Sequence, residues 1–539
     1  MIPKRGQERV QRFLAGLVPV LFLLLLIFST VGTRFQSGVH EQGLTEEAYT
    51  HLAVAGNLVE GKEYTLLPGQ PVPPLKHALW RVGVGLFSAG GGGVVGGALM
   101  FGVLCTVLTL MYITAWSRMV SGRFLYIVLA GIMVALSPGF IAPLLCGSSQ
   151  PLATLLVVGA CVVHAARCSR NTPLPMASAV LLGLAGWINV FLPLLWLVLV
   201  AHAWSCYRFT PMAAPKRMQG GWAKALSGLG LMALIMAPMF LWNFSVIQVP
   251  WPPLPGIPIS GELWAERPLH ALLKTLALIG QGVPESYGRL GSGPLLGSAY
   301  ARGMILLGLV MVALAAVKDT WRRGLLLPLF LLVLAPLLGA LCAPYLGWSG
   351  VDMLFRTFEP LCVATAVAGF WLLIPPCQSF LKRTGRKMPA YAVYVLPGLL
   401  LVGLLIQETT ASATLVRKHA SVAEVAWRCR EGLLQQVEEG TLDLSLVATD
   451  QPGWVALQKK GEVLDLSGEF ARREILWCIA SDGTWKEEEL RKVLSDNRPT
   501  VFILWDQDLL DLDLGLALED LVPAERARQY GLPRVARPE

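Results

Sequence analysis

The sequence is poor in charged residues. Only 15% of its 539 residues are Asp, Glu, Lys or Arg, whereas soluble globular proteins carry about 25%. Hydrophobic residues make up 54% of the chain, and long apolar runs occur at 13–30, 93–116 and 388–406. Such runs approach or exceed the roughly 20 residues that cross a bilayer. Because backbone amides in hydrocarbon must pair within their own segment, unalternating runs of this length predict an α-helical polytopic membrane protein.

We expect about eleven spanning helices. The first apolar run follows four basic residues, and its long core without a clear cleavage site favours a retained signal anchor over a removed signal peptide. Around Trp187 and Asn189 the apolar segment is too long for one helix, so we expect a broken turn before Pro193. The expected spans are 13–31, 93–116, 124–139, 151–167, 174–189, 190–206, 226–245, 300–317, 324–343, 360–376 and 389–408.

The net charge of +8 comes from basic residues whose positions indicate the orientation of the chain in the membrane. Basic residues gather in alternate short connectors, such as 216–224 and 382–387, and at the N-terminus. Because Lys and Arg are retained on the cytoplasmic side, we expect a cytoplasmic N-terminus. The charge therefore does not indicate a nucleic-acid partner.

Two domains are expected, namely a transmembrane domain at 1–408 and a soluble α/β domain at 409–539. Long outer loops at 32–92 and 246–299 interrupt the first, and an apolar patch at 270–279 is expected in the membrane interface. In the second, 445–449 and 499–505 are expected to be buried strands, with a helix at 486–495 between them. An odd number of spans places this domain outside the cytoplasm.

Common catalytic signatures are missing. The chain has no P-loop, dinucleotide fingerprint, zinc motif or Ser-His-Asp signature. Its ten cysteines show no metal-ligand spacing, and those in apolar segments are interpreted as small hydrophobic residues. Cys429 and Cys478 fall in the outer domain, where the possibility of a disulfide stays open. The cysteines in or beside apolar segments are Cys105, Cys161, Cys168, Cys206, Cys362 and Cys377.

Four polar groups are expected on the outer side, and each has an ordinary structural explanation. Residues 45–49 (TEEAY) suit a helix N-terminus, and 146–150 (CGSSQ) suit a tight turn. Residues 347–356 (GWSGVDMLFR) suit an interfacial anchor with an Asp–Arg helical pair. Lys76 and His77 suit the solvated face of a loop helix.

The order of these groups along the chain resembles the GT-C superfamily. These polytopic glycosyltransferases use polyprenyl-phosphate-linked sugars on the outer face of the membrane. The likeness is to the bacterial branch that includes mycobacterial arabinofuranosyltransferases and mannosyltransferase-like proteins. The stretches that carry it are EEAY at 46–49, NLVEG at 57–61, LPGQ at 67–70, HALW at 77–80, GSSQ at 147–150, GVD at 350–352, RTF at 356–358 with Pro360, ATDQPG at 448–453 and VLDLSG at 463–468.

The resemblance implies a sugar transfer from a polyprenyl-phosphate donor to a glycan, lipid or protein acceptor of the cell envelope. It places the chain in the bacterial inner membrane, in contact with membrane lipids and with its C-terminal domain in the periplasm. Glu46 or Glu47 would be the general base, and Arg356 would bind the donor phosphate. Asp352 would orient Arg356 or contact the sugar. The resemblance further implies substrate contacts for Lys76, His77 and Gln150, and it leaves dependence on a divalent metal open.

Departures from the family pattern keep a second hypothesis open. Both aspartates of the first motif are glutamates here, and arginines of the family are replaced by Ala53 and Gly56. The glutamate of the later turn is Gln150. The alternative is therefore an inactive GT-C-like scaffold that binds a lipid or protein partner. A transporter ranks last, because the chain shows few mid-membrane ionisable residues and no convincing repeat.

Overall fold

The computed structural model describes most of the helical body and parts of the C-terminal region. The side chains of some helical residues, among them Glu46, Glu47 and Asp352, lie outside this description. The described residues are 13–27, 44, 46–62, 64–66, 75, 77–120, 122–145, 147–168, 174–208, 214–247, 306–314, 324–372, 378–379, 394–395, 398–406, 409–410, 431–433, 435–439, 445–449, 452–458, 462–466, 478, 486–504, 516–519 and 534–538.

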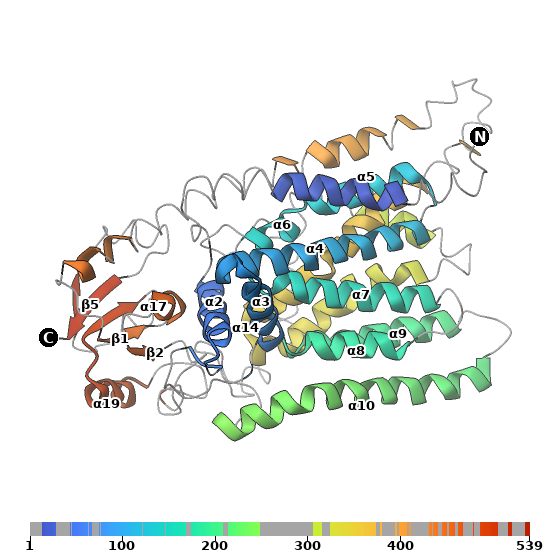
Figure 1. Ribbon diagram of the computed structural model, residues 1–539. Coiled ribbons are helices and arrows are strands. Elements are labelled where there is room, and N and C mark those ends of the chain that lie inside the picture. Colours follow the sequence, from blue (N-terminus) through green and yellow to red (C-terminus); the bar gives the residue numbers. More distant parts are fainter. Residues whose placement is uncertain are drawn as a thin grey trace.

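Helices form the body of the molecule (Figure 1). Several run roughly side by side, and α7 lies between α4 and α8. The labelled helices of the body are α2 (Glu46–Val59), α3 (Ala78–Phe87), α4 (Gly93–Val120), α5 (Phe124–Leu136), α6 (Pro138–Leu145), α7 (Gln150–Cys168), α8 (Met176–Ala185), α9 (Leu195–Arg208), α10 (Ala214–Ile247) and α14 (Leu327–Trp371).

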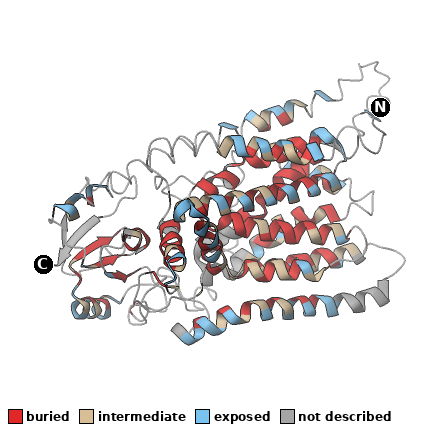
Figure 2. Ribbon diagram, viewed as in Figure 1, coloured by how far each residue is buried: buried red, intermediate tan, exposed pale blue. Residues whose placement is uncertain are grey.

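Three described helical segments are long and apolar enough to cross a membrane: 78–120, 150–168 and 222–245. Shorter apolar helices accompany them, and the total of eleven spans stays a prediction. Figure 2 shows buried residues concentrated in the central helices, whereas α10 exposes much of one side. Leu234 and Leu241 on α10 are 69% and 70% exposed. A stripe of exposed leucines suits a lipid-facing helix, since water-soluble surfaces rarely gather such patches.

The expected break near Trp187 is present. Helix α8 ends at Ala185, and α9 begins at Leu195 after a short 3-10 turn at Leu192–Leu194. The side chain of Asn189 accepts a hydrogen bond from the backbone N–H of Phe191 (3.0 Å). This bond satisfies a donor that the interrupted helix leaves unpaired.

One expected connector is helical instead. The sequence predicts separate spans at 324–343 and 360–376, but α14 runs from Leu327 to Trp371 without a break. The glycines of the intervening segment weaken a helix by only about 1 kcal/mol each. Prolines also occur within membrane helices, where neighbouring groups satisfy the freed carbonyls. The expected connector between the spans 324–343 and 360–376 is therefore part of one helix.

Small residues allow close helix packing in the centre of the body. A Cβ on Gly308, in helix 306–314, would overlap the backbone of Ala366 on α14, and a Cβ on Gly369 would overlap the backbone of Gly308. Membrane helices associate through such small residues because lipid provides no hydrophobic driving force between them. Nearby, Trp116 of α4 donates a hydrogen bond to the hydroxyl of Thr365 on α14 (2.8 Å).

The C-terminal region contains a mixed five-stranded sheet in the order β2-β1-β3-β5-β4. Strands β2 and β3 are parallel to β1, while β5 is antiparallel to both β3 and β4. Strands β1 and β3 and helix α19 lie where the sequence predicts them, within a few residues. The elements are β1 (Leu446–Thr449), α17 (Pro452–Gln458), β2 (Glu462–Asp465), α19 (Glu487–Asn497), β3 (Val501–Leu504), β4 (Leu516–Glu519) and β5 (Arg534–Pro538).

The sheet region docks on α2, which lies between it and the helical body (Figure 1). Tyr49 and Val54 of α2 share one hydrophobic core with Trp454 of α17 and with Val447 and Val501 of the sheet. A Cβ on Gly453 would overlap the backbone nitrogen of Thr50, so α17 contacts α2 with no space between them. Helix α2 is thus packed against the C-terminal region on one side and against the helical body on the other.

Candidate active site

The turn before α7 packs against the first turns of α2. Gly147 adopts a positive φ of 71°, which a glycine tolerates without steric cost. A Cβ there would lie 3.0 Å from the Cβ of Ala48 and 3.0 Å from Leu44. Two of the predicted site segments, 45–49 and 146–150, therefore meet although about a hundred residues separate them in sequence.

His77 joins a third segment to this turn. It precedes α3 in a left-handed conformation, with φ 56° and ψ 21°. Its ring Nδ1 lies 2.8 Å from the hydroxyl of Ser149, and both residues are buried. Because the hydroxyl can donate or accept, this bond suits either tautomer of the imidazole. His77 is thus a buried partner of the turn, which contradicts the structural alternative of a solvated helix face.

A buried guanidinium lies next in this group. Arg81 follows His77 by one turn of α3 and is fully buried. Its Nε donates to Nδ1 of His51 on α2 (3.2 Å), and its Nη1 donates to the hydroxyl of Tyr64 (3.1 Å). Arginine stays protonated in proteins, so Nδ1 of His51 must accept, which leaves its proton on Nε2 when the ring is neutral.

The two histidines connect these contacts into one group. The rings of His51 and His77 lie 5.0 Å apart between centroids, tilted by 52°. Tyr64, unlike the histidines, is only partly buried. We name Ser149, His77, His51, Arg81 and Tyr64 the histidine–arginine group. It runs from the start of α7 to the edge of the loop that follows α2.

Asn57 holds the part of that loop that carries Tyr64. Its buried side-chain amide donates to the carbonyls of Thr65 (2.9 Å) and Leu66 (3.1 Å). Gly61, with φ 71°, ends α2, and the N–H of Lys62 bonds back to the carbonyl of Asn57 (2.9 Å). The segment 57–61 therefore closes the helix and positions Tyr64 beside Arg81.

Gln150 begins α7 and is buried beside the histidine–arginine group. Its Nε2 donates to the hydroxyl of Thr154 (3.3 Å). Among the described residues, its Oε1 is buried and has no hydrogen-bond partner. An amide oxygen accepts hydrogen bonds but does not take up a proton at neutral pH. Gln150 can therefore bind a hydroxyl group but cannot replace a catalytic carboxylate.

Arg356 lies in a second polar group on α14. It is buried, as is Glu359 one turn later. The carboxylate Oε1 of Glu359 accepts a hydrogen bond from the hydroxyl of Ser137 (3.1 Å), where α5 meets α6. Helix α6 then leads to the turn at Gly147. The two polar groups are thus linked through the short helix α6.

The structure brings together part of the predicted site. Of the predicted residues, His77 and Gln150 lie at the turn before α7, and Arg356 lies in the α14 group. The backbone of Glu46 and Glu47 forms the first turn of α2, but their side chains and that of Asp352 lie outside the description, as does all of Lys76. Their predicted roles are not tested.

Four residues of these two groups had no predicted role, namely His51, Arg81, Tyr64 and Glu359. Helical spacing could have found two of them, because His51 follows Glu47 by four residues and Arg81 follows His77 by four. Tyr64 lies in a loop, and Glu359 has only its position after Arg356 to mark it. Neither gave a signal that distinguishes it from an ordinary polar residue.

Comparisons with known proteins rest on structure alone. No protein-family model matches the sequence, and no curated protein sequence is significantly similar to it. The oligosaccharyltransferase of Archaeoglobus fulgidus is similar in structure, with a TM-score of 0.52 and 11% identity, over 93% of this chain and 70% of that protein. ArnT of Cupriavidus metallidurans, solved with undecaprenyl phosphate bound, has a TM-score of 0.50 and 10% identity, over 96% of this chain and 97% of that protein.

Proposed function

We propose that this chain, which has the GT-C fold of membrane glycosyltransferases, transfers a sugar from a polyprenyl-phosphate donor to a glycan, lipid or protein acceptor. The reaction would take place on the outer face of the bacterial inner membrane. One observation carries the proposal: the buried Arg81 donates a hydrogen bond to His51 of α2, the helix whose first turn contains Glu46 and Glu47. The transfer requires a positive charge for the leaving phosphate and a carboxylate for the acceptor proton.

The leaving group needs the positive charge. In the transfer, the acceptor oxygen bonds to the anomeric carbon of the sugar while the bond from that carbon to the phosphate oxygen breaks. Polyprenyl phosphate leaves with additional negative charge, which a fixed guanidinium stabilises. Arg81 is oriented by its bonds to His51 and Tyr64, so little reorganisation is needed. Arg356, the predicted phosphate ligand, would contribute a second guanidinium from α14, with Asp352 orienting it.

The acceptor hydroxyl needs a base. Glu46 and Glu47 stand in the first turn of α2, and Glu47 precedes His51 by one helical turn. A carboxylate there would take the hydroxyl proton as the new bond forms. Gln150 would hold the acceptor or the sugar through its Oε1, and Lys76 and His77 would add contacts to the phosphate or the acceptor.

The bound lipid of the ArnT structure supports a polyprenyl-phosphate carrier as donor. The apolar outer surfaces of helices such as α10 suit a long lipid tail, because isoprenoid chains and lipid tails are equally apolar.

The test is transfer by the full chain in nanodiscs. Undecaprenyl-phosphate-linked sugars are supplied, with and without Mg²⁺, and released undecaprenyl phosphate is measured by mass spectrometry. The double variant Glu46→Gln with Glu47→Gln should transfer at least ~100-fold more slowly, the usual size of a lost general base. Glu60→Gln, a partly exposed glutamate just after α2 that bonds Lys62, is the matched control and should keep full rate.

The alternative is an inactive scaffold, and one observation favours it. The C-terminal region packs on α2 without space at Gly453, which suits a structural role for this interface. A scaffold predicts a cellular phenotype that depends on residues 409–539 but not on Glu46, Glu47 or Arg356. Full transfer by the double variant would refute the assigned base, and no transfer by the unaltered chain would favour the scaffold.

A further inference from the structure

Two helices present the same pair of metal-binding residues to each other. Helix α7 carries His164 and Cys168, and α9 carries His202 and Cys206, each pair four residues apart. Residues at this spacing lie on one face of a helix. The chain has only seven histidines and ten cysteines in 539 residues, so their repeated pairing on two packed helices is a specific feature.

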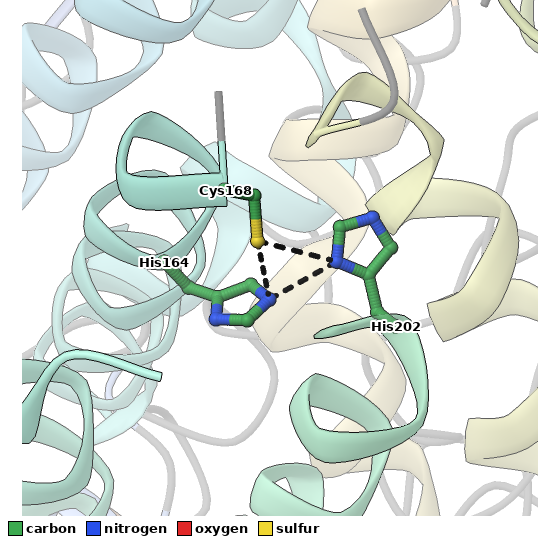
Figure 3. A group of neighbouring side chains, drawn as sticks. All are labelled: His164, Cys168 and His202. Carbon is green, nitrogen blue, oxygen red and sulfur yellow. Dashed lines mark hydrogen bonds between the residues drawn. The ribbon is translucent and has the colours of Figure 1, made fainter. Parts of the chain in front are cut away.

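Three donor atoms converge between these helices (Figure 3). Nε2 of His164 lies 3.0 Å from Nδ1 of His202, and Sγ of Cys168 lies 3.3 Å and 3.9 Å from these two nitrogens. All three residues are buried. In a tetrahedral zinc site with bonds of about 2.0–2.3 Å, the ligand atoms lie roughly 3.4–3.8 Å apart. The observed distances match this spacing within a few tenths of an ångström.

We propose that His164, Cys168 and His202 bind one thiophilic metal ion, with Zn²⁺ as the ion that the ligand set fits. Two imidazoles and a thiolate form a borderline-soft set, which selects zinc or copper over magnesium or calcium. Sharing one cation satisfies all three lone pairs at once in a site that water does not reach.

Cys206 would supply the fourth ligand. Its Sγ lies 3.8 Å from Nε2 of His202, the ring nitrogen opposite the convergence point. A rotation of its side chain toward Cys168 would complete a His₂Cys₂ set, the composition of closed structural zinc sites. The ion would then cross-link α7 and α9.

The surroundings hold the ligands in place. The edge of the His202 ring packs against Phe330 of α14, with centroids 5.2 Å apart and planes at 80°. Gly324 lies against the end of α7, where a Cβ would come 2.8 Å from the carbonyl oxygen of Ala165 and 3.6 Å from the Cβ of Cys168. Metal sites depend on such outer contacts to fix the orientation of their ligands.

This site is separate from the proposed glycosyltransferase site and does not rest on it. It lies at the Cys168 end of α7, whereas Gln150 and Ser149 lie at the other end. Eighteen residue steps at 1.5 Å each make that separation roughly 27 Å. The ion would therefore stabilise the helical body rather than take part in sugar transfer.

The test uses the full chain, purified in detergent without a histidine tag, stripped with a chelator and reloaded. We expect one Zn²⁺ per chain by elemental analysis, and a thiolate-to-metal absorption band after reloading with Co²⁺. Cys168→Ser should lose the band and weaken binding at least tenfold. Cys206→Ser should weaken binding less. Cys161→Ser, a buried cysteine of α7 outside the group, is the matched control and should bind as the unaltered chain does.

A second measurement guards against variants that fail to fold. In the unaltered chain, Zn²⁺ should raise the melting temperature and slow alkylation of Cys168 and Cys206. If the stripped chain takes up neither Zn²⁺ nor Co²⁺ and its melting temperature does not change, the group is a hydrogen-bonded cluster and the proposal is wrong. Equal loss of binding in Cys161→Ser and Cys168→Ser would also overturn it.

Discussion

The two ends of α7 carry different chemistry built in different ways. At the Gln150 end, α2, α3 and the turn before α7 bring together hydroxyls, imidazoles and a guanidinium. At the Cys168 end, two helices bring together imidazoles and a thiol. The first set suits an anion such as phosphate, and the second suits a soft cation. One helix thus separates two sites of opposite electrostatic preference.

The largest loss of sugar transfer is expected from replacing Arg81. Replacing it with Gln removes the buried charge and should lower sugar transfer at least ~100-fold, the size seen when a preorganised charge-stabilising donor is lost. Binding of undecaprenyl phosphate, followed by native mass spectrometry, should fall in parallel. Zn²⁺ binding at the other end of α7 should not change, because the two groups lie roughly 27 Å apart along the helix.

Two controls sharpen this prediction. Arg81→Lys keeps the charge but loses the geometry of the guanidinium, so it should recover only part of the rate. Arg491→Gln removes a half-exposed arginine that pairs with Glu487 on α19, and it should transfer normally. Normal transfer by Arg81→Gln would show that the buried arginine is structural and that the phosphate ligand lies elsewhere.

The Gln150 end was predictable only in part from the sequence. The order of short motifs indicated that 45–49, 77–80 and 147–150 belong together, and Gly147 does pack against Ala48. The contact of Arg81 with His51 was not predictable, because it depends on how α3 packs against α2. Local spacing predicts which residues share a helix face, but it does not say which faces meet.

The Cys168 end shows the opposite case. The sequence shows that each histidine–cysteine pair is four residues apart. Buried cysteines in apolar helices, however, are usually small hydrophobic residues. Only the packing of α7 on α9 shows that the two pairs face each other. Cys168, interpreted from the sequence as a small hydrophobic residue, lies 3.3 Å from Nε2 of His164 across the same helix face, and the proposed metal site depends on that contact.

A smaller effect on sugar transfer is expected from weakening the docking of the C-terminal region on α2. In Gly453→Ala, the added Cβ would overlap the backbone of Thr50, and α17 would have to move away. Overpacking of this kind typically costs about 1–3 kcal/mol. We expect a lower melting temperature and faster proteolytic release of the C-terminal region, with sugar transfer reduced and Zn²⁺ binding unchanged.

Gly432→Ala is the control for this prediction. Gly432 is exposed, and a Cβ there would meet nothing within 4 Å. The variant should melt and resist protease as the unaltered chain does. Equal behaviour of the two variants would mean that α17 does not pack tightly on α2, and it would remove the main support for a structural role of this interface.

The smallest effect should come from the turn at Gly147, and a matched glycine isolates its cause. Gly147 and Gly61 have the same φ of 71°, so alanine at either position carries the same backbone strain of about 1–2 kcal/mol. Only at Gly147 would the new Cβ press on Ala48 and Leu44, at 3.0 Å, whereas at Gly61 it meets nothing within 4 Å. Gly147→Ala should therefore weaken undecaprenyl phosphate binding several-fold beyond Gly61→Ala, at a similar melting temperature. If the two variants bind equally, contact between the turn and α2 does not set the geometry of the Gln150 end, and the contrast between the ends of α7 would rest on Arg81 alone.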